Sequence, residues 1–338
     1  MAAMRAAWYE RQGAARDVLV VGAMADPHPA AGEVRIRIAA SAINPGDLKK
    51  RRDAFGYGMS FARVVPHSDG AGVVDEVGEG VPAARIGERV WCHGAQSYRP
   101  FGTAAELAVV PAAQALALPD ALSFATGACL GIPGITAHRA VHAAGGVAGA
   151  TLLVQGGAGA VGGFAVGLAR RAGAHVVATA RSERDAALAR GAGAHAVVRS
   201  DTLSRAALVA AIRAHAPDGV AHIVEVAFDA NIDVDAEVLA GGGSIAAYAT
   251  AAPRPALPFW PLLFKNARIF LLGSDDFSPA HKAEAAAAID ALLREGWNAI
   301  EIARTFALDE IAEAHQHAET QRGAGRVVLT VAEAGPIG

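Results

Sequence analysis

The fold is decided by the stretch Thr151-Leu152-Leu153-Val154-Gln155-Gly156-Gly157-Ala158-Gly159-Ala160-Val161-Gly162. Residues 151–155 have the apolar pattern of a buried strand, and the glycines that follow fit G-x-G-x-x-G. In such a turn the first glycine permits the tight bend, the second lets a pyrophosphate approach the backbone, and the third lets the helix pack closely on the strand. The start of the next helix then offers unpaired N–H groups and partial positive charge to the phosphates.

The residues beyond this turn predict a βαβ unit. Apolar residues recur at helical spacing over 161–172, and a second apolar strand is expected at 175–180. Because strand, glycine turn, helix and strand follow one another, we expect a dinucleotide on the turn. The alternative is a tight strand–helix turn without a ligand. The expected contacts are Gly157, Gly159, Ala160, Val161 and Gly162.

The end of the second strand favours NADPH over NADH. NAD-binding folds carry an acidic residue about 20 positions beyond the glycines, where it holds the ribose 2′-hydroxyl. Here the strand ends in Ala180-Arg181-Ser182-Glu183-Arg184, and arginine can clamp a 2′-phosphate with charge-assisted hydrogen bonds. We therefore expect Arg181, Ser182 and Arg184 to bind that phosphate. The competing interpretation is a solvated helix start, with Glu183 close by.

Composition limits the class of protein. The 338 residues are enough for two domains, and 53% of them are hydrophobic while 19% are charged. The net charge of −3 and the lack of a basic block argue against nucleic acid. Cys92 and Cys129 are too far apart for a zinc or disulfide pattern, and no apolar run is long enough to span a membrane. Without a signal segment, a cytoplasmic protein is expected.

The order of predicted strands and helices changes along the chain. Alternating residues such as those at 33–40 indicate a β-rich first third, and helices are expected at 120–129 and 134–144. From 151 onward strands and helices alternate, which predicts a doubly wound parallel sheet. A helix at 280–295, a short strand near 305–307, a helix at 309–320 and a strand at 326–331 lack this rhythm. We expect them to return to the first domain.

Several short segments carry a family resemblance. They are Ser41-Ala42-Ile43-Asn44-Pro45-Gly46-Asp47, Asp69-Gly70-Ala71-Gly72-Val73-Val74, Gly87-Glu88-Arg89-Val90, Ile132-Pro133-Gly134-Ile135-Thr136-Ala137 and Gly325-Arg326-Val327-Val328-Leu329. In this order and at these spacings the chain resembles the medium-chain dehydrogenase/reductase superfamily, and more narrowly the zinc-free, zeta-crystallin-like NADPH:quinone oxidoreductases.

The resemblance implies an α/β fold with two domains. It implies a GroES-like β-rich catalytic domain at 1–128 and 274–338, and a Rossmann doubly wound parallel-sheet domain at 129–273, which binds NADPH. It also implies a homodimer that forms through an edge strand, here Ala267–Leu272.

The resemblance also implies that no catalytic metal is needed. Zinc-dependent relatives place a Cys where this chain has Asn44 and a His where it has Ser68, and the lobe that binds structural zinc is absent. A catalytic zinc needs about three protein ligands. Cys92, His67 and His93 are the remaining alternative, by an arrangement foreign to the family.

The expected reaction is transfer of a hydride from NADPH to a quinone. Asn44 is the first candidate to donate a hydrogen bond to the acceptor oxygen, although it equally suits a loop-shaping role before Pro45. Lys49, where relatives carry a tyrosine, is a weaker catalytic candidate, since 49–52 reads as a solvated basic helix face. Phe55 and Tyr57 are expected to form an aromatic wall for a flat substrate, or else to belong to the core.

Further cofactor contacts are expected from four places. Thr136 matches the family's threonine near the nicotinamide, with a helix-start hydroxyl as the alternative. Ala227, Tyr248 and Thr250 follow strands of the predicted sheet, where ligands lie at the carboxyl ends. Arg322 is expected to reach the cofactor from the returning segment. The family's usual phosphate-binding Lys and Tyr are replaced by Asp185 and Ser200, while His315 and His317 are expected to face solvent.

Three other functions stay open from the sequence. They are an NADPH-dependent reductase of activated alkenes such as enones or alkenals, an NADPH-binding protein with a structural or regulatory role, and, least expected, a zinc-dependent alcohol dehydrogenase. Fold alone does not choose among them.

Overall fold

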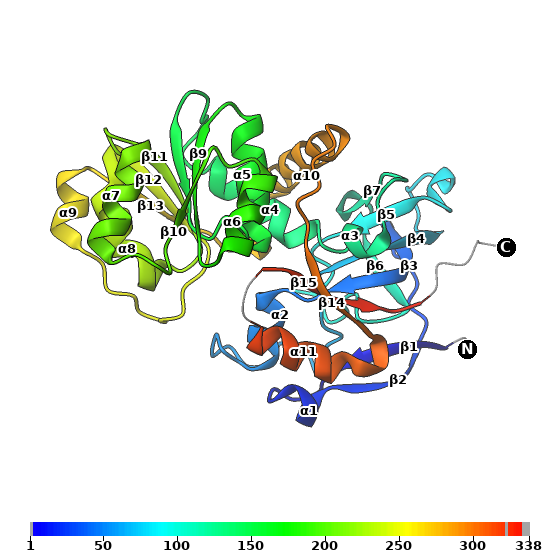
Figure 1. Ribbon diagram of the computed structural model, residues 1–338. Coiled ribbons are helices and arrows are strands. Elements are labelled where there is room, and N and C mark those ends of the chain that lie inside the picture. Colours follow the sequence, from blue (N-terminus) through cyan, green and yellow to red (C-terminus); the bar gives the residue numbers. More distant parts are fainter. Residues whose placement is uncertain (1–2, 322–323, 333–338) are drawn as a thin grey trace. The chain divides into compact units, whose positions relative to one another are not determined.

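The computed structural model describes residues 3–321 and 324–332, and it divides into two compact units (Figure 1). The first unit contains the chain up to Ile132 and the segment from Ile300 onward, and the second runs from Pro133 to Ala299. These boundaries differ from the expected ones, since the chain returns to the first unit at residue 300 rather than at 274.

The first unit is built on a mostly antiparallel sheet. In the described residues it has seven strands in the order β14-β15-β3-β4-β5-β7, with β6 also paired to β3, beside a two-stranded sheet of β1 and β2. Residues alternate along β3, and Val34, Ile36 and Ile38 are fully buried. The strands are β1 (Ala3–Trp8), β2 (Val20–Ala25), β3 (Glu33–Ala42), β4 (Asp69–Val77), β5 (Arg89–Cys92), β6 (Leu107–Pro111), β7 (Ala115–Ala117), β14 (Ile302–Ala307) and β15 (Arg326–Thr330).

Short helices join these strands. They are α1 (Ala15–Val18), α2 (Pro45–Arg51), α3 (Phe124–Gly127) and α11 (Ile311–Thr320). Pro45 occupies the first turn of α2, and the Asp47 carboxylate accepts a hydrogen bond from the Asn44 N–H, which fixes the start of the helix. The helix expected at 120–129 is wrong in length, because α3 begins only after its N-cap, Ser123.

The second unit is a parallel sheet, as expected. Within its residues six strands follow the order β10-β9-β8-β11-β12-β13, and every neighbouring pair is parallel. The direction of winding reverses between β8 and β11, where doubly wound folds bind ligands. The strands are β8 (Thr151–Val154), β9 (His175–Ala180), β10 (Ala196–Arg199), β11 (Val220–Glu225), β12 (Leu239–Ala247) and β13 (Arg268–Leu271).

Helices connect these strands and cover the sheet. Helix α5 packs on α6 and α7 packs on α8, as right-handed crossovers require for two helical layers. The helices are α4 (Gly131–Val141), α5 (Ala160–Arg171), α6 (Glu183–Ala192), α7 (Arg205–His215), α8 (Phe228–Val238), α9 (Phe259–Phe264) and α10 (Pro279–Arg294).

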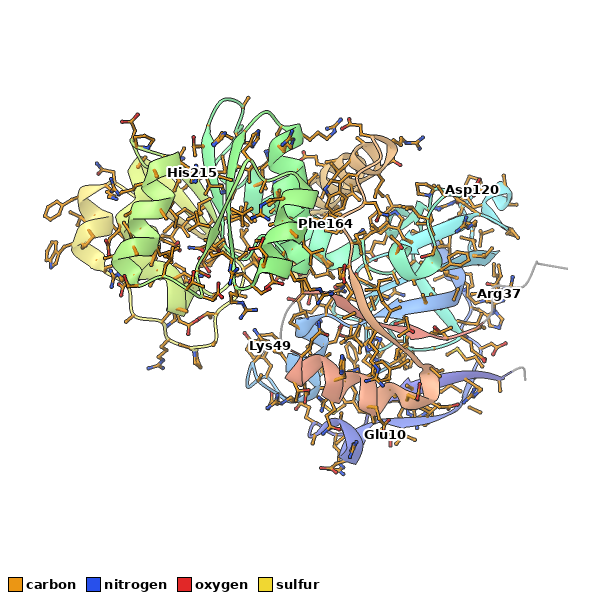
Figure 2. The ribbon with its side chains drawn as sticks, viewed as in Figure 1. Glu10, Arg37, Lys49, Asp120, Phe164 and His215 are labelled. Atoms are coloured by element: carbon orange, nitrogen blue, oxygen red, sulfur yellow. The ribbon has the colours of Figure 1, made fainter. Side chains whose placement is uncertain are left out.

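Helix α10 explains the different boundary. It packs against α5, and its fully buried Ile289 lies so close to α4 that a Cβ on Gly134 would be 2.6 Å from it. The Trp297 ring, beyond the helix, lies 4.8 Å from the ring of Phe164. Figure 2 labels Phe164 on α5. Apolar burial therefore holds 279–297 in the second unit.

Candidate functional site

The glycine turn is a tight backbone cradle. It begins at Gly156, whose φ of +69° favours glycine. A Cβ on Gly157 would lie 2.6 Å from Ala178 Cβ, and a Cβ on Gly162 would lie 2.1 Å from the Gly156 carbonyl oxygen. These two glycines are therefore required by close packing of strand, turn and helix.

The outer side of the turn suits a phosphate. Gly159 is exposed and serves as the N-cap of α5, and a Cβ there would approach only the Gly156 carbonyl oxygen, at 3.3 Å. Ala160 and Val161 are the first residues of this twelve-residue helix, so their N–H groups have no carbonyl partner within the helix. The cradle therefore fits a dinucleotide pyrophosphate.

Just after β9, the acidic Glu183 is bonded to other arginines and not to Arg181. Glu183 accepts hydrogen bonds from Arg190 at 3.1 Å and from Arg199 at 3.2 Å, and these contacts lower the pKa of its carboxyl. Arg181 is exposed and makes no hydrogen bond or ion pair within the described chain. The Ser182 hydroxyl accepts from Asp185 N at 3.0 Å and so caps α6.

Three other predicted contacts meet at the carboxyl ends of β11 and β12. Ala227 N donates to the Glu225 side chain, and Tyr248 N donates to the Glu225 carbonyl at 3.1 Å. Thr250 Oγ1 lies 3.0 Å from Asp229 Oδ1. Thr136 is buried in the middle of α4, which runs from Gly131 to Val141, so it is not at a helix start. Arg322 lies outside the described residues.

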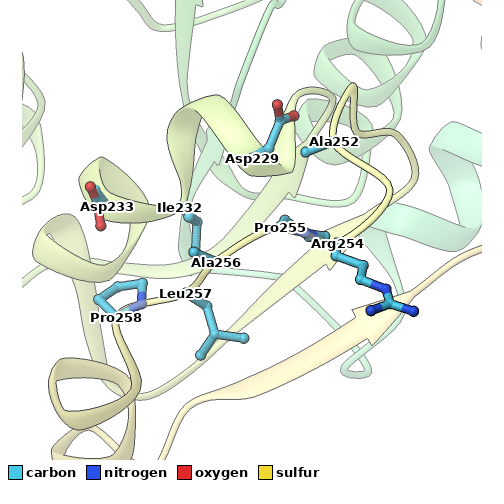
Figure 3. A pocket seen from close by; sticks show the side chains of 9 residues that line it. All are labelled: Asp229, Ile232, Asp233, Ala252, Arg254, Pro255, Ala256, Leu257 and Pro258. Atoms are coloured by element: carbon cyan, nitrogen blue, oxygen red, sulfur yellow. The ribbon is translucent and has the colours of Figure 1, made fainter.

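A pocket of about 450 Å³ borders this edge of the second unit (Figure 3). It lies along α8, and the chain that leads to α9 forms its other wall. The sequence offered no signal for it, because its walls come from a helix and an irregular segment. Its lining is Asp229, Ile232, Asp233, Ala252, Arg254, Pro255, Ala256, Leu257 and Pro258.

In the first unit, Asn44 is held between two charged residues. Its Nδ2 donates to Asp69 Oδ2 at 2.8 Å, and its Oδ1 accepts from an Arg326 guanidinium nitrogen at 2.9 Å. Ile132 N donates to both oxygens of Asp69, at 3.0 and 2.9 Å. Burial raises the pKa of Asp69 to about 7, while the hydrogen bond from Asn44 and the charge of Arg326 oppose that rise. Asn44 was predicted from the sequence, but the roles of Asp69 and Arg326 were not.

The other substrate candidates lie on the loop after α2. The Phe55 and Tyr57 rings stack with centroids 5.9 Å apart, and Lys49 Nζ lies 5.8 Å from the Phe55 centroid. Phe55 is 46% exposed and Tyr57 is 85% exposed, so neither belongs to the core. This pair forms an accessible aromatic surface.

The first unit is poorly suited to the alternative zinc site. Nowhere in residues 3–321 and 324–332 do three or more His, Cys, Asp or Glu side chains gather to hold a metal. The Cys92 thiol is buried, which raises its pKa to about 12. His67 uses Nδ1 on Ser41 at 2.8 Å and Nε2 on His315 at 2.8 Å. The Asp69 carboxylate packs directly against the backbone of Gly131, since its Oδ1 would be 2.2 Å from a Cβ on that glycine.

Two predictions about polar side chains are wrong. His315 was expected to face solvent, but it is fully buried against His67. Arg51 was expected on a solvated face, but it is also fully buried and forms an ion pair with Glu319. Both errors arise because α2 and α11 pack together, so that each helix covers a polar residue of the other.

Known proteins share this architecture. The alcohol dehydrogenase GroES-like domain matches residues 30–120, and the zinc-binding dehydrogenase family matches residues 160–291. The quinone oxidoreductase of Mus musculus is 30% identical over 293 residues, 86% of this chain and 86% of that protein. The 2-methylene-furan-3-one reductase of Solanum lycopersicum is 37% identical over 155 residues, 44% of this chain and 40% of that protein.

A solved structure agrees with these matches. An alcohol dehydrogenase superfamily protein from Novosphingobium aromaticivorans has a TM-score of 0.86 at 28% identity, covering 97% of this chain and 100% of that chain. No helix in the described part of the chain is long and apolar enough to cross a membrane. Because the likeness to the mouse protein extends over most of both chains, this chain is a nicotinamide-dependent oxidoreductase and belongs to the zeta-crystallin-like quinone oxidoreductases of the medium-chain dehydrogenase/reductase superfamily.

Proposed function

We propose that this chain transfers a hydride from NADPH to a quinone without a metal. The observation that carries the proposal is the buried Asn44 carboxamide, held between Asp69 and Arg326 where zinc-dependent relatives place a metal ligand. A neutral hydrogen-bond donor at that position suits an acceptor that needs charge stabilisation but no strong Lewis acid.

The preference for NADPH is supported by Arg181. It stands at the end of β9 without a protein partner in the described residues, while Glu183 is engaged by Arg190 and Arg199. A free guanidinium can form bidentate hydrogen bonds with a 2′-phosphate. Arg184 and Ser182 lie next to it in sequence, and we include both in the phosphate site.

The protein residues at the reaction site would hold and orient the substrate, and they would not themselves be oxidised or reduced. NADPH, when bound, supplies the hydride. One Nδ2 hydrogen of Asn44 donates to Asp69, and Nδ2 makes no other hydrogen bond within the described residues. The second hydrogen is therefore available to an acceptor oxygen, and Arg326 fixes the plane of the carboxamide. Phe55 and Tyr57 offer ring faces to a flat substrate.

A homodimer is part of the proposal. Strand β13 pairs with β12 on one side and has no described strand on its other side. Leu271 of this strand is 78% exposed, and Phe264 and Trp260 of the neighbouring α9 are 77% and 64% exposed. Such an apolar edge invites pairing with a second copy. Light scattering on the wild type and on Leu271→Lys tests it, since a dimer should become monomeric.

The test of the function is oxidation of NADPH by the purified protein with a simple quinone. Matched reactions contain NADH, a metal chelator or no quinone. NADPH-specific turnover that survives chelation supports the proposal. Activity that disappears with the chelator and returns with zinc would point to the zinc-dependent alternative, and binding without turnover would point to a non-catalytic role.

A second candidate is reduction of an activated alkene. The tomato relative is named for a ketone that carries an adjacent methylene group, and a methylene in that position is electron-poor. Product analysis separates the two reactions, because alkene reduction yields a saturated ketone and quinone reduction yields a hydroquinone or semiquinone.

A further inference from the structure

A line of hydrogen bonds runs beneath the glycine turn and joins the ends of β8 and β9 to helix α8. Gly156 N donates to Thr179 Oγ1 at 2.9 Å, and Thr179 Oγ1 donates to Gln155 Oε1 at 2.8 Å. Gln155 Nε2 then donates to Asp235 Oδ1 of α8 at 2.8 Å. Gln155, Thr179 and Asp235 are each buried, so this line is shielded from solvent.

Chemistry fixes the direction of every bond in the line. The Gly156 N–H can only donate, so Thr179 Oγ1 accepts it and must use its own hydrogen elsewhere. That hydrogen goes to Gln155 Oε1, which leaves the amide nitrogen of Gln155 to face Asp235. No other orientation of the Gln155 amide satisfies both neighbours.

The line ends on a pair of buried acids. Asp235 and Glu225 are both fully buried and are close enough for a hydrogen bond between their carboxyl groups. Glu225 already accepts from Ala227 N and from Asn231 Nδ2 at 3.0 and 3.2 Å. Asp235 Oδ2 has no N–H or hydroxyl partner among the described residues. A proton on Asp235 Oδ2, donated to Glu225, satisfies both groups.

The surroundings keep that proton in place. Two buried carboxylates side by side repel each other, so burial and Glu225 together raise the pKa of Asp235 well above its ordinary value. Burial also raises the pKa of Glu225. Tyr248 directly follows β12 and lies beside Glu225, and burial raises its pKa as well, so it stays neutral. Within the described residues, the polar groups that act on Asp235 are Glu225 and Gln155.

We propose that Asp235 and Glu225, by sharing one proton, are positioning residues for the cofactor: through Gln155 and Thr179 they hold Gly156 at the start of the phosphate-binding turn. This inference rests on the proposed binding of NADPH. Gly156 matters because its carbonyl oxygen packs against Gly162 and accepts a hydrogen bond from Gly159 N at 2.9 Å. Loss of the shared proton in alkaline solution leaves two adjacent anions and loosens the line.

Asp235→Asn is the sharpest test, because asparagine imitates the protonated acid permanently. Its oxygen can accept from Gln155 while its amide donates to Glu225. Thr179→Val removes the hydroxyl and leaves the Gly156 N–H unpaired. Ser244→Ala is the matched control, since Ser244 is a buried hydroxyl of the same sheet that bonds His222 at 2.7 Å.

Two measurements are made on each protein: NADPH affinity by fluorescence at about pH 7 and about pH 9.5, and amide hydrogen exchange at Gly156 without cofactor. We expect wild-type affinity to fall about tenfold at the higher pH, and Asp235→Asn to remove that fall. Thr179→Val should lose about tenfold at both pH values and exchange faster at Gly156. Ser244→Ala should match the wild type.

Two results would overturn the inference. One is the same pH dependence in Asp235→Asn as in the wild type, and the other is wild-type exchange at Gly156 in Thr179→Val. If the wild type bound no NADPH at all, the proposed function would fail. The exchange rates would then still decide whether the acid pair positions the turn.

Discussion

His67 Nε2 and His315 Nε2 lie 2.8 Å apart inside the first unit, and both rings are fully buried. Arg51 Nε donates to His315 Nδ1 at 3.2 Å, and because a guanidinium can only donate, the His315 hydrogen must sit on Nε2. His67 therefore accepts at Nε2 and donates from Nδ1 to Ser41 Oγ at 2.8 Å. Both histidines are neutral, each with one defined tautomer.

This arrangement predicts acid sensitivity of folding. Burial lowers the pKa of His67 to about 3 and that of His315 well below its ordinary value. Between about pH 6.5 and about pH 3 the unfolded chain therefore binds more protons than the native protein. Stability contributed by the pair is full above the unfolded pKa and falls as pH decreases through this window, by about 1.4 kcal/mol per pH unit for each histidine.

Urea unfolding across this pH range checks the prediction by comparing variants. His315→Gln should flatten the pH dependence, whereas His215→Gln, at the exposed end of α7 (Figure 2), should leave it unchanged. The comparison matters because Asp69 acts in the opposite sense. Its raised pKa of about 7 makes the native protein bind more protons between about pH 4 and 7. An equal slope in both variants would contradict the assignment.

The burial of Arg51 and His315 could not be predicted from the sequence. Arg51 and His315 are 264 residues apart, and each belongs to a short helix whose polar pattern looks solvated. Only the packing of α2 on α11 buries them. The glycine turn is different, because Gly157 and Gly162 owe their role to neighbours within the same βαβ unit. Local constraints of this kind are visible in sequence.

The candidate site likewise has a part that could be predicted from local sequence and a part that could not. Asn44 could be identified from its loop, but the partners that hold its carboxamide come from β4 and from β15, 282 residues away in the case of Arg326. Likewise the boundary at residue 300 depends on apolar contacts of α10 and Trp297 with α5. Alternation of strands and helices predicted the parallel sheet correctly, but it carries no information on where a returning segment packs.

Arg181→Ala should separate the two nicotinamide cofactors. Loss of a charge-assisted contact with a 2′-phosphate costs about 1.5–3 kcal/mol, so the Michaelis constant for NADPH should rise about 10- to 100-fold while that for NADH hardly changes. Steady-state kinetics with both cofactors measures this. Arg171→Ala, an exposed arginine of α5 paired with Glu295, is the charge-matched control. A parallel rise for NADH would refute the role of Arg181.

Asn44→Ala should lower kcat with a quinone about 10- to 100-fold and leave the Michaelis constant for NADPH nearly unchanged, because the lost contact is to the acceptor. Arg326→Leu should share this effect, since it frees the Asn44 carboxamide to rotate. The control is Gln96→Ala, a buried amide of the same unit that bonds Lys50 at 3.0 Å. Unfolding midpoints of all variants distinguish lost catalysis from lost folding. Full kcat in Asn44→Ala would remove Asn44 from the reaction.

Two glycine-to-alanine substitutions in the second unit should act in opposite directions. At Gly162 a Cβ would lie 2.1 Å from the Gly156 carbonyl oxygen, so Gly162→Ala must displace the backbone of the turn and should destabilise the protein by about 1–3 kcal/mol. At Gly191 in α6 nothing lies within 4 Å of the new atom, so Gly191→Ala should stabilise by about 0.5–1 kcal/mol through helix propensity. Urea unfolding gives both values, and NADPH titration should show weaker binding for Gly162→Ala alone. If Gly162→Ala bound NADPH like the wild type, close packing at this glycine would not control the phosphate site.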